Sequence, residues 1–323
     1  MLRTTARTTL AFLALTATTT IASAQSDYPN KPIRIIVGLA AGAINDVQAR
    51  VVAAKLAERV KQPVVVENRT GAGGNIAAEF VARAAPDGYT LLMTPTATMA
   101  INPAVYTKLP YKSPDDFVAI TQLSTYPLFL AVQQDLPVKN VKELLAHAKA
   151  NPTKANLASP ATFFDMVTAL LTLDTGVKFE VIRFKSTPET MTALITGQAM
   201  IAFQEYRSLA PQLKAGKAKA LATLSTTRSA DLPDVPTIVE AGYGHAAAQP
   251  FSGIVAPAKT PPAIVKKLET EINAVLNSPD VKERWKSLGL FSVESSSEAF
   301  GKLIVSEIKR WKDVATKANI KLD

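Results

Sequence analysis

The sequence has no cysteine and only two histidines among its 323 residues. Without cysteine, disulfide cross-links, thiolate-bound zinc, iron–sulfur clusters and thiol nucleophiles are excluded, and two histidines leave little for a histidine-rich metal site. Motifs of the common enzyme classes are missing too: there is no G-x-S-x-G elbow, H-E-x-x-H pair, Walker A loop or G-x-G-x-x-G loop. We therefore expect a protein that is not an enzyme and that needs no metal and no cofactor.

Long hydrophobic runs are also scarce. Outside the first 24 residues, no apolar segment reaches the roughly 20 residues that span a bilayer. The first 24 residues resemble a secretory signal peptide, because Arg3 and Arg7 precede a short apolar run at 10–15 and the segment closes on Ala22-Ser23-Ala24. We therefore expect export of the chain, with cleavage before Gln25.

The excess of basic residues is modest and dispersed. Cleavage would remove Arg3 and Arg7 and lower the formal charge from +9 to +7. The remaining lysines and arginines form no run interleaved with aromatic residues, which would be typical of a nucleic-acid-binding surface. We therefore expect no nucleic-acid partner, whereas a weakly positive field favours small anions.

Short β-branched runs alternate with helical patterns from residue 33 onward. Strands are predicted at 33–37, 63–67 and 89–94, with helices between them at 45–60 and 76–84. Strand–helix–strand units at this spacing pair in parallel through right-handed crossovers. The pattern continues, with strands predicted at 119–123, 128–132, 179–184, 200–203 and 218–224 and helices at 141–150, 162–173, 263–276 and 297–318. We expect an α/β protein whose length suggests about two domains.

Three polar turns each follow a predicted strand, at Gly38–Asp46, Thr70–Asn75 and Thr94–Thr98. In an open parallel sheet, ligands bind beyond the carboxyl ends of the strands, where helix N-termini offer free N–H groups to anions. Taken singly, each turn has an ordinary explanation, with Asn45 and Thr98 as helix caps and Gly42 as a turn residue. Three such turns at one edge favour an anion-binding cleft.

Several longer motifs occur in order along the chain. The first turn contains Ala41-Gly42-x-x-Asn45-Asp46, and the second strand leads into Glu67-Asn68-Arg69-x-Gly71-Ala72-Gly73-Gly74-Asn75. Further motifs are Ala85-Pro86-Asp87-Gly88-Tyr89, Ala100-Ile101-Asn102-Pro103, Lys214-Ala215-Gly216-Lys217 and Leu232-Pro233-Asp234-Val235-Pro236-Thr237. On these motifs, the chain resembles the Bug family, the periplasmic solute-binding receptors of tripartite tricarboxylate transporters.

The resemblance implies a two-lobed periplasmic-binding-protein clamp, or Venus flytrap, in which each lobe is a mostly parallel sheet flanked by helices. It also implies a monomer in the periplasm that captures a small organic acid and delivers this carboxylate to the membrane permease subunits of the transporter. Family members hold the ligand carboxylate with the backbone of the first two strand–helix turns, partly through ordered water.

The predicted boundaries of the lobes follow two irregular stretches. A strand is interrupted at Tyr126-Pro127, and an irregular segment runs from His245 to Pro250. We expect residues 25–124 plus 250–323 to form lobe 1 and residues 125–249 to form lobe 2.

The candidate ligand-binding residues lie in the strand-end turns of both lobes. Lobe 1 supplies Leu39, Ala41, Gly42, Asn45, Asp46, Gly73, Gly74, Asn75, Thr94, Thr96 and Thr98, and lobe 2 supplies Ser159, Thr162, Phe163, Asp165, Lys185, Gln204 and Glu205.

Lobe 2 departs from the family pattern at positions that bear on the ligand. Asp165 stands where a histidine is usual, and Gln204-Glu205 replace Asp-Asn. The two acids would repel the far anion of a dicarboxylate, with Lys185 able to offset one of them. Phe163, Phe164 and Phe184 would make the pocket apolar, although core packing is the ordinary explanation for the first two.

These departures predict a monocarboxylate with an apolar or aromatic body, and an amino or ring-nitrogen donor on it would suit Asp165. If Asp165 and Glu205 instead point into solvent or cap helices, an ordinary dicarboxylate site remains.

Two other functions stay open on the sequence. The same clamp could serve as a ligand sensor that presents its closed form to a sensor kinase. A secreted hydrolase would need a nucleophile and a base, and the sequence offers Ser159 without a histidine in any nearby motif.

Overall fold

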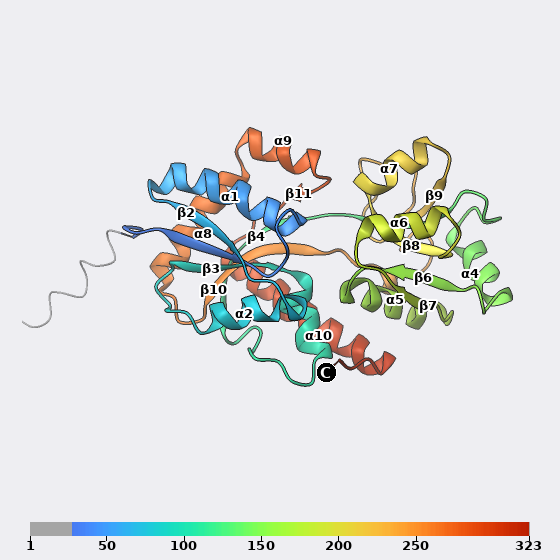
Figure 1. The fold of residues 1–323 in the computed structure, drawn as a ribbon, viewed down its shortest axis with the longest axis horizontal. Helices are drawn as coiled ribbons and strands as arrows, with labels where there is room; N and C mark the ends of the chain where they lie inside the picture. The colour runs from blue at the N-terminus through green and yellow to red at the C-terminus, as the bar shows by residue number, and fades with distance from the viewer. Residues whose placement is uncertain (1–27, 323) are drawn as a thin grey trace, which may run out of the picture.

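The computed structural model describes residues 28–322, which form two β-sheets flanked by helices (Figure 1). The six-stranded sheet has the strand order β11-β4-β10-β3-β1-β2, and the five-stranded sheet has the order β7-β6-β8-β5-β9. The chain leaves the first sheet after β4 and returns to it at β10. We call residues 28–125 and 250–322 the first unit and residues 126–249 the second unit.

The first unit holds elements from both ends of the described chain. Its strands are β1 (Ile33–Val37), β2 (Val64–Asn68), β3 (Thr90–Pro95), β4 (Phe117–Thr125), β10 (Phe251–Pro257) and β11 (Phe291–Ser292). Its helices are α1 (Ile44–Val60), the 3-10 turn η1 (Ala72–Gly74), α2 (Asn75–Ala82), the π-helical turn η2 (Ala97–Ile101), α3 (Asn102–Val105), α8 (Pro262–Leu276), α9 (Pro279–Ser287) and α10 (Ser297–Ala318).

The second unit is one continuous segment. Its strands are β5 (Leu128–Gln133), β6 (Asn156–Ser159), β7 (Glu180–Arg183), β8 (Ile201–Glu205) and β9 (Ala218–Thr223). Its helices are α4 (Val141–Ala150), α5 (Thr162–Thr175), α6 (Thr187–Ile195), α7 (Tyr206–Lys214) and the 3-10 turn η3 (Gly244–Ala246).

Strand direction places the three polar turns together. β1 pairs in parallel with β2 and with β3, whereas β10 runs antiparallel to its neighbours β3 and β4. The turns that follow β1, β2 and β3 therefore leave the sheet at one edge. Figure 1 shows that α1, which starts after the first of these turns, begins at its end nearest the second unit.

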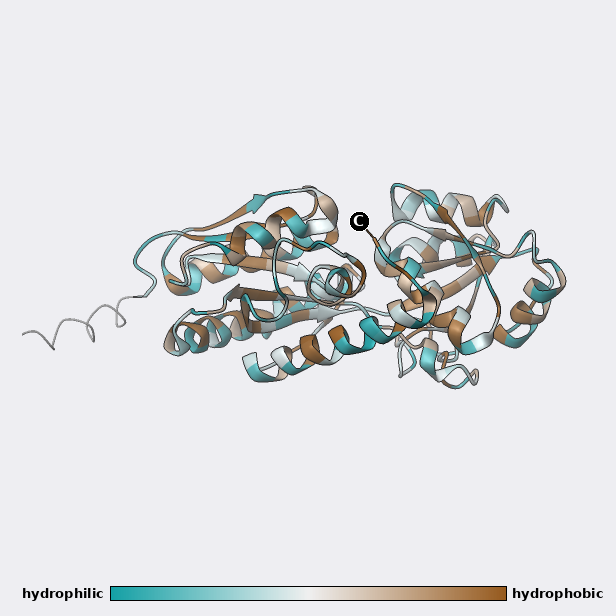
Figure 2. Ribbon diagram, turned by 90° about the horizontal axis from the view of Figure 1, so that it is seen from below, coloured by the Kyte–Doolittle hydropathy of each residue, from teal (hydrophilic) through white to brown (hydrophobic). Residues whose placement is uncertain are grey.

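The central strands of each sheet are buried on both faces. In β1, Ile33, Ile35 and Val37 pack under α1 and α8, while Ile36 faces α2 and α10 on the other side. In the second unit, Leu130 faces α4 and α5, and Phe129 faces α6 and α7. This is why central strands such as β3, β5 and β10 are mostly apolar runs rather than alternating ones, and several strands are brown in Figure 2. The predicted α/β class with two helix-flanked sheets is confirmed.

The last helix joins the two units. Phe300 and Ile304 of α10 pack in the core of the first unit, whereas Trp311 and Val314 pack in the core of the second. The Trp311 ring lies 5.9 Å from that of Phe163 in an edge-to-face contact. The N-terminal half of α10 therefore packs in the first unit and its C-terminal half packs in the second. In the sequence, the whole helix follows β10, on which the chain returns to the first sheet.

Several elements have no counterpart among the predicted ranges, namely the strands β6, β10 and β11 and the helices α3, α6, α7 and α9. β10 is buried at all of its positions, but its sequence has neither an alternating pattern nor a dense β-branched run. α9 is mostly charged and buries only Val281 and Trp285, so the expectation of two C-terminal helices was wrong, and there are three. The expected signal peptide lies outside the described residues. Within residues 28–322, no helix is long and apolar enough to cross a membrane.

We predict that Gly253→Ala destabilises the protein. Gly253 lies in β10, and an added Cβ would stand 2.2 Å from Phe300 Cζ and 2.8 Å from the backbone oxygen of Thr121. Because a paired strand cannot retreat from such a contact, the free energy of unfolding should fall by about 1–3 kcal/mol. Urea denaturation of the purified variant measures this change.

Gly301→Ala is the matched control, because its Cβ would meet only Ala119 Cβ, at 3.8 Å, inside helix α10. That change should leave the free energy of unfolding unchanged or raise it by up to about 1 kcal/mol. Equal effects of the two substitutions would contradict the packing argument.

Candidate functional site

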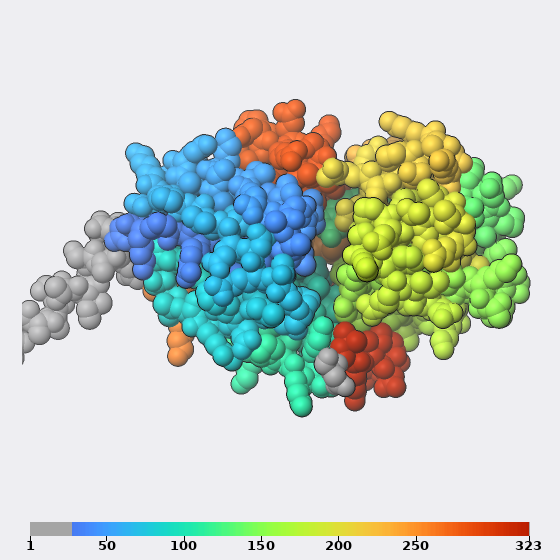
Figure 3. All heavy atoms as spheres, viewed as in Figure 1, coloured from blue at the N-terminus to red at the C-terminus, as the bar shows by residue number. Residues whose placement is uncertain are grey.

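The three strand-end turns of the first unit pack directly against one another. A Cβ on Gly38 would stand 2.8 Å from Gly74 Cα, and a Cβ on Gly74 would stand 2.8 Å from Thr98 Oγ1. Gly74 also has a φ of 92°, a conformation that other residues rarely adopt. The third turn runs into η2, which contacts α5 of the second unit. Figure 3 shows the surface hollowed between the two units at this place.

The first turn is held in shape by Asp46. This carboxylate is 2% exposed and accepts hydrogen bonds from the Gly42 backbone N–H at 2.8 Å, Arg50 Nε at 3.0 Å and Asn68 Nδ2 at 2.8 Å. Burial by itself would raise the pKa of Asp46, but these hydrogen bonds and the charge of Arg50 outweigh it and keep the pKa below its usual value. Asp46 and the Gly42 N–H are therefore engaged in the turn and are not free for a ligand.

Asn45 and Gln48 present buried amide groups without a partner. Asn45 is 5% exposed and Gln48 is fully buried, yet neither Asn45 Nδ2 nor Gln48 Nε2 has a hydrogen-bond partner. The two residues are three apart at the start of α1, so their side chains lie on the same face of the helix. A buried donor left unpaired costs about 1–3 kcal/mol, so such a pair indicates a place for an acceptor.

Gln48 also contacts both strands on which the chain crosses between the units. Ser124 Oγ donates to Gln48 Oε1 at 2.7 Å, and Ser252 Oγ does so at 2.8 Å. Ser124 and Ser252 face each other across the β4–β10 pair. Gln48 was absent from the predicted site. The sequence did offer a signal, because the polar residue Gln48 falls in the four-residue spacing of Val52 and Leu56 on the buried face of α1.

The second and third turns are tied into the first unit by their polar side chains. Asn75 Oδ1 accepts from Asn102 Nδ2 at 2.7 Å. Thr96 Oγ1 accepts from the Phe251 backbone N–H at 2.7 Å, which joins the third turn to β10. Thr94 and Thr98 are buried, so the hydroxyls of the third turn are less available to a ligand than the sequence suggested.

The remaining donors of the first unit are backbone groups. No side chain caps the N-terminus of α1 or of α2. The first N–H groups of each helix have no partner within the helix. Leu39 is half-buried and accepts from Asn68 Nδ2 through its backbone oxygen, whereas Ala41 is exposed. Gly73 adopts a φ of 63° in η1, directly before α2, and an added Cβ there would meet no atom closer than 3.6 Å.

In the second unit, Asp165 is already paired. Ser159 Oγ donates to Asp165 Oδ1 at 2.6 Å, and Arg183 Nη2 lies 2.6 Å from Asp165 Oδ2, forming an ion pair without hydrogen-bond geometry. Burial raises the pKa of Asp165 more than Ser159 and Arg183 lower it. The expectation that Asp165 presents a free charge to the ligand is therefore wrong, because Arg183 supplies the counter-charge.

The aromatic residues of this unit belong to its core. Phe163 and Phe164 are 7% and 8% exposed, and their rings meet edge to face at 5.7 Å. The expectation of an aromatic pocket wall is corrected at both positions, since Phe163 also packs on Trp311. Phe184 is half-buried against the opposite face of the sheet. Thr162 is half-buried at the start of α5, and Lys185 is exposed.

Gln204 and Glu205 at the end of β8 differ in their surroundings. Gln204 is fully buried, donates to Thr190 Oγ1 at 2.9 Å and accepts from Ser208 Oγ at 2.8 Å, so it is satisfied within the unit. Glu205 is half-buried and makes no hydrogen bond or ion pair with any described side chain. Burial raises the pKa of Glu205, with only a partial offset from the charge of Arg207.

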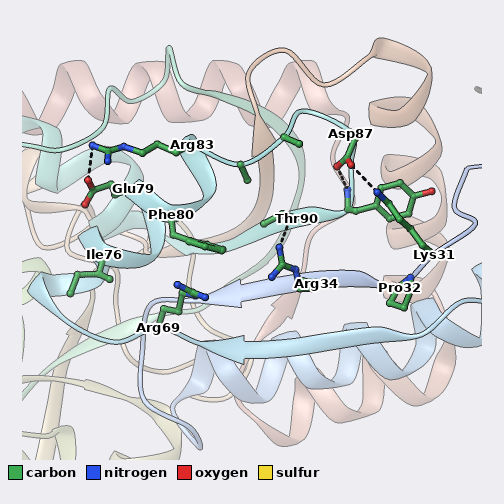
Figure 4. A pocket seen from close by; sticks show the side chains of 13 residues that line it. Lys31, Pro32, Arg34, Arg69, Ile76, Glu79, Phe80, Arg83, Asp87 and Thr90 are labelled. Carbon is green, nitrogen blue, oxygen red and sulfur yellow. Dashed lines mark hydrogen bonds and ion pairs between the residues drawn. The ribbon is translucent and has the colours of Figure 1, made fainter. Parts of the chain in front are cut away.

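A separate hollow of about 720 Å³ lies on the outer face of the first unit, between α2 and the strands β1 and β3 (Figure 4). Its cations are already held by neighbours: Lys31 pairs with Asp87, Arg34 donates to Thr90, Arg69 pairs with Glu67, and Arg83 pairs with Glu79. It contains none of the strand-end turns, so the hollow between the units is the better candidate site. Among residues 28–322, no cluster of His, Asp or Glu is arranged to hold a metal ion.

Comparison with known proteins gives one family. The family model described as "Tripartite tricarboxylate transporter family receptor" matches residues 48–320. Protein BugT of Bordetella pertussis is 34% identical over 298 residues, which cover 91% of each chain. A UPF0065 protein in the gbd 5' region of Cupriavidus necator is 35% identical over 306 residues, covering 93% of this chain and 91% of the relative.

Solved structures agree in fold over nearly the whole chain. Rpa4515 of Rhodopseudomonas palustris with adipate has a TM-score of 0.79 and 29% identity, covering 91% of this chain and 99% of its own. MatC of the same organism with bound malate has a TM-score of 0.76 and 31% identity, covering 89% of this chain and 99% of its own. The periplasmic binding protein BugD has a TM-score of 0.76 and 31% identity, covering 91% of this chain and 99% of its own.

We predict that Asp46→Asn destabilises the protein in a pH-dependent way. The amide would turn an NH₂ group toward at least one of the three donors around position 46, so the free energy of unfolding at pH 7 should fall by about 2 kcal/mol. Because the folded-state pKa of Asp46 is lowered, the carboxylate stabilises the fold at pH values above the unfolded-state pKa of about 3.9. That contribution is lost as the pH falls through the folded-state value.

The measurement is urea denaturation of both proteins at pH 7 and at steps below pH 5. Asp234→Asn, at an exposed position, is the control and should change stability little at any pH. A difference between wild type and Asp46→Asn that stays constant down to pH 3 would show that the charge of Asp46 is not what holds the turn.

Proposed function

The chain belongs to the receptor family of tripartite tricarboxylate transporters, and from this we propose that it captures a small organic carboxylate in the periplasm and delivers it to the permease subunits of such a transporter. The proposed site is the hollow between the two units. Its proposed anchor is the unpartnered, buried Asn45 and Gln48 amides together with the uncapped starts of α1 and α2.

The observation that carries this proposal is the buried pair of amide donors. A carboxylate has about four acceptor positions and no donor, so it can satisfy Asn45 Nδ2, Gln48 Nε2 and helix N–H groups together. The positive ends of the α1 and α2 dipoles favour its charge. A neutral ligand would satisfy the donors but would gain nothing from the two dipoles.

Closure of the clamp follows from the way the units are connected. They are joined by the paired strands β4 and β10, and Gln48 bonds to a serine on each. A ligand that contacts Gln48 therefore touches the group that links α1 to both crossing strands. We propose that ligand contacts from the second unit close the two units over the carboxylate, which excludes water and gives the permease a distinct shape to recognise.

The placement of the second-unit residues changes the expected ligand. The rings of Phe163 and Phe164 pack in the core, and Asp165 is paired with Arg183. The argument for an aromatic monocarboxylate therefore loses the support of these residues. Relatives of the same fold hold adipate and malate, so linear aliphatic acids are the first candidates for this chain.

We predict that Asn45→Leu weakens ligand binding without weakening the fold. Leucine has nearly the shape of asparagine, and removing an unpaired buried donor should leave the free energy of unfolding unchanged or raise it. A hydrogen bond to a charged carboxylate contributes about 1.5–3 kcal/mol, so the affinity should fall by roughly 10- to 150-fold.

The probe is chosen by a thermal-shift screen of the purified protein with malate, adipate, succinate, citrate, benzoate and nicotinate, together with native mass spectrometry for a co-purified acid. Calorimetry with the most stabilising acid then compares wild type and Asn45→Leu. If no carboxylate stabilises the protein, or if Asn45→Leu binds the acid as tightly as wild type does, the proposed function or its proposed anchor is wrong.

A further inference from the structure

Glu205 has no hydrogen-bond or ion-pair partner for its side chain among the described residues. It occupies the N-cap position of α7, yet its side chain makes no capping hydrogen bond there. It is half-buried, and Arg207 does not pair with it but extends to within 3.5 Å of the position that a Cβ on Gly289 would take, in the first unit. The explanations that it caps a helix or points freely into solvent therefore do not fit the structure.

Asp165, the other acid predicted for the site in the second unit, is in a different situation. Asp165 is held by Ser159 and Arg183, so its charge is compensated within the second unit. Glu205 thus remains the carboxylate without a hydrogen bond or ion pair among the predicted second-unit site residues, with only a partial offset from the charge of Arg207. A half-buried carboxylate without a partner is unfavourable in the free protein, and a donor supplied by a ligand would remove that cost.

Glu205 and the amide pair are linked through the crossing segment of the chain. Ser124, which bonds Gln48, and Leu128, which pairs with Glu205 in the β5–β8 register, are four residues apart on the crossing segment. These four residue steps span at most about 14 Å, to which the step from Leu128 to Glu205 on the neighbouring strand and the contact of Ser124 with Gln48 are added. Tyr126 lies between them, packs against the cores of both units, and is close enough to Glu205 for the carboxylate charge to act on its hydroxyl.

We propose that the ligand is an amino- or hydroxy-carboxylate, whose carboxylate binds the Asn45–Gln48 amide pair and whose ammonium or hydroxyl group donates to Glu205 across the hollow. This inference rests on the proposed function and adds the second half of the ligand. Two unpaired donors on one side and one unpaired acceptor on the other are complemented by a molecule with an acceptor at one end and a donor at the other. A linear dicarboxylate would place its second anion against Glu205.

The test compares acids that differ only at the far end. Three chain lengths are used with a carboxylate, a methyl, a hydroxyl or an ammonium group at the terminus: the four-carbon set is succinate, butyrate, 4-hydroxybutyrate and 4-aminobutyrate, and matching five- and six-carbon sets extend to adipate and 6-aminohexanoate. Thermal shift identifies the best length, and calorimetry then gives the affinities of that set for the full mature chain.

The expected result is that the amino or hydroxy acid binds at least about tenfold more tightly than the dicarboxylate of equal length. Glu205→Gln should lower the affinity for the ammonium-bearing acid about tenfold and raise that for the dicarboxylate. Glu180→Gln, an exposed carboxylate on the edge strand β7, changes the net charge equally and should alter neither affinity.

The opposite preference overturns the inference but not the proposed function. If the dicarboxylate binds most tightly and Glu205→Gln leaves or lowers that affinity, Glu205 does not select a donor, yet carboxylate capture stands. If Glu180→Gln and Glu205→Gln act alike, the effect is one of net charge and the inference fails. If no acid of any length binds, both the proposed function and this inference are wrong.

Discussion

The hydrogen bonds of one buried glutamine connect helix α1 to the two strands on which the chain crosses between the units. Gln48 joins the first turn of α1 to Ser124 and Ser252, which face each other where the chain leaves the first unit and returns to it. The same side chain leaves its amide nitrogen unpaired. One buried residue thus contacts the start of α1 and both crossing strands and keeps an unpaired donor, in a water-excluded place where an unmade hydrogen bond is expensive.

Charge in this protein is used in two ways. Asp46 is almost fully buried but receives three hydrogen bonds, so it stabilises the first turn and offers nothing to a ligand. Asp165 is similarly occupied by Ser159 and Arg183. Glu205 lacks such partners. The type of residue therefore does not decide between a structural and a ligand-binding acid; the donors that surround it do.

The last helix sets a condition on any movement of the two units. α10 packs in the first unit through Phe300 and in the second through Trp311, whose ring rests against Phe163. An opening about β4 and β10 must either carry the end of α10 along with the second unit or separate those two rings. The helix thus acts as a third connection besides the crossing strands, and it contacts η2 of the first unit and α5 of the second.

The sequence by itself determined the α/β class, most helices and strands, the three turns at one sheet edge and the family, because these depend on local periodicity and on contiguous motifs. It missed β10, whose burial comes from neighbours on both sides rather than from its own pattern. It also placed Asp46, Asp165 and Phe163 in the site, and it omitted Gln48. Only the tertiary structure decided these roles, since whether a buried polar or aromatic side chain is satisfied depends on partners far away in the chain, such as Arg183 for Asp165, Trp311 for Phe163 and Ser252 for Gln48.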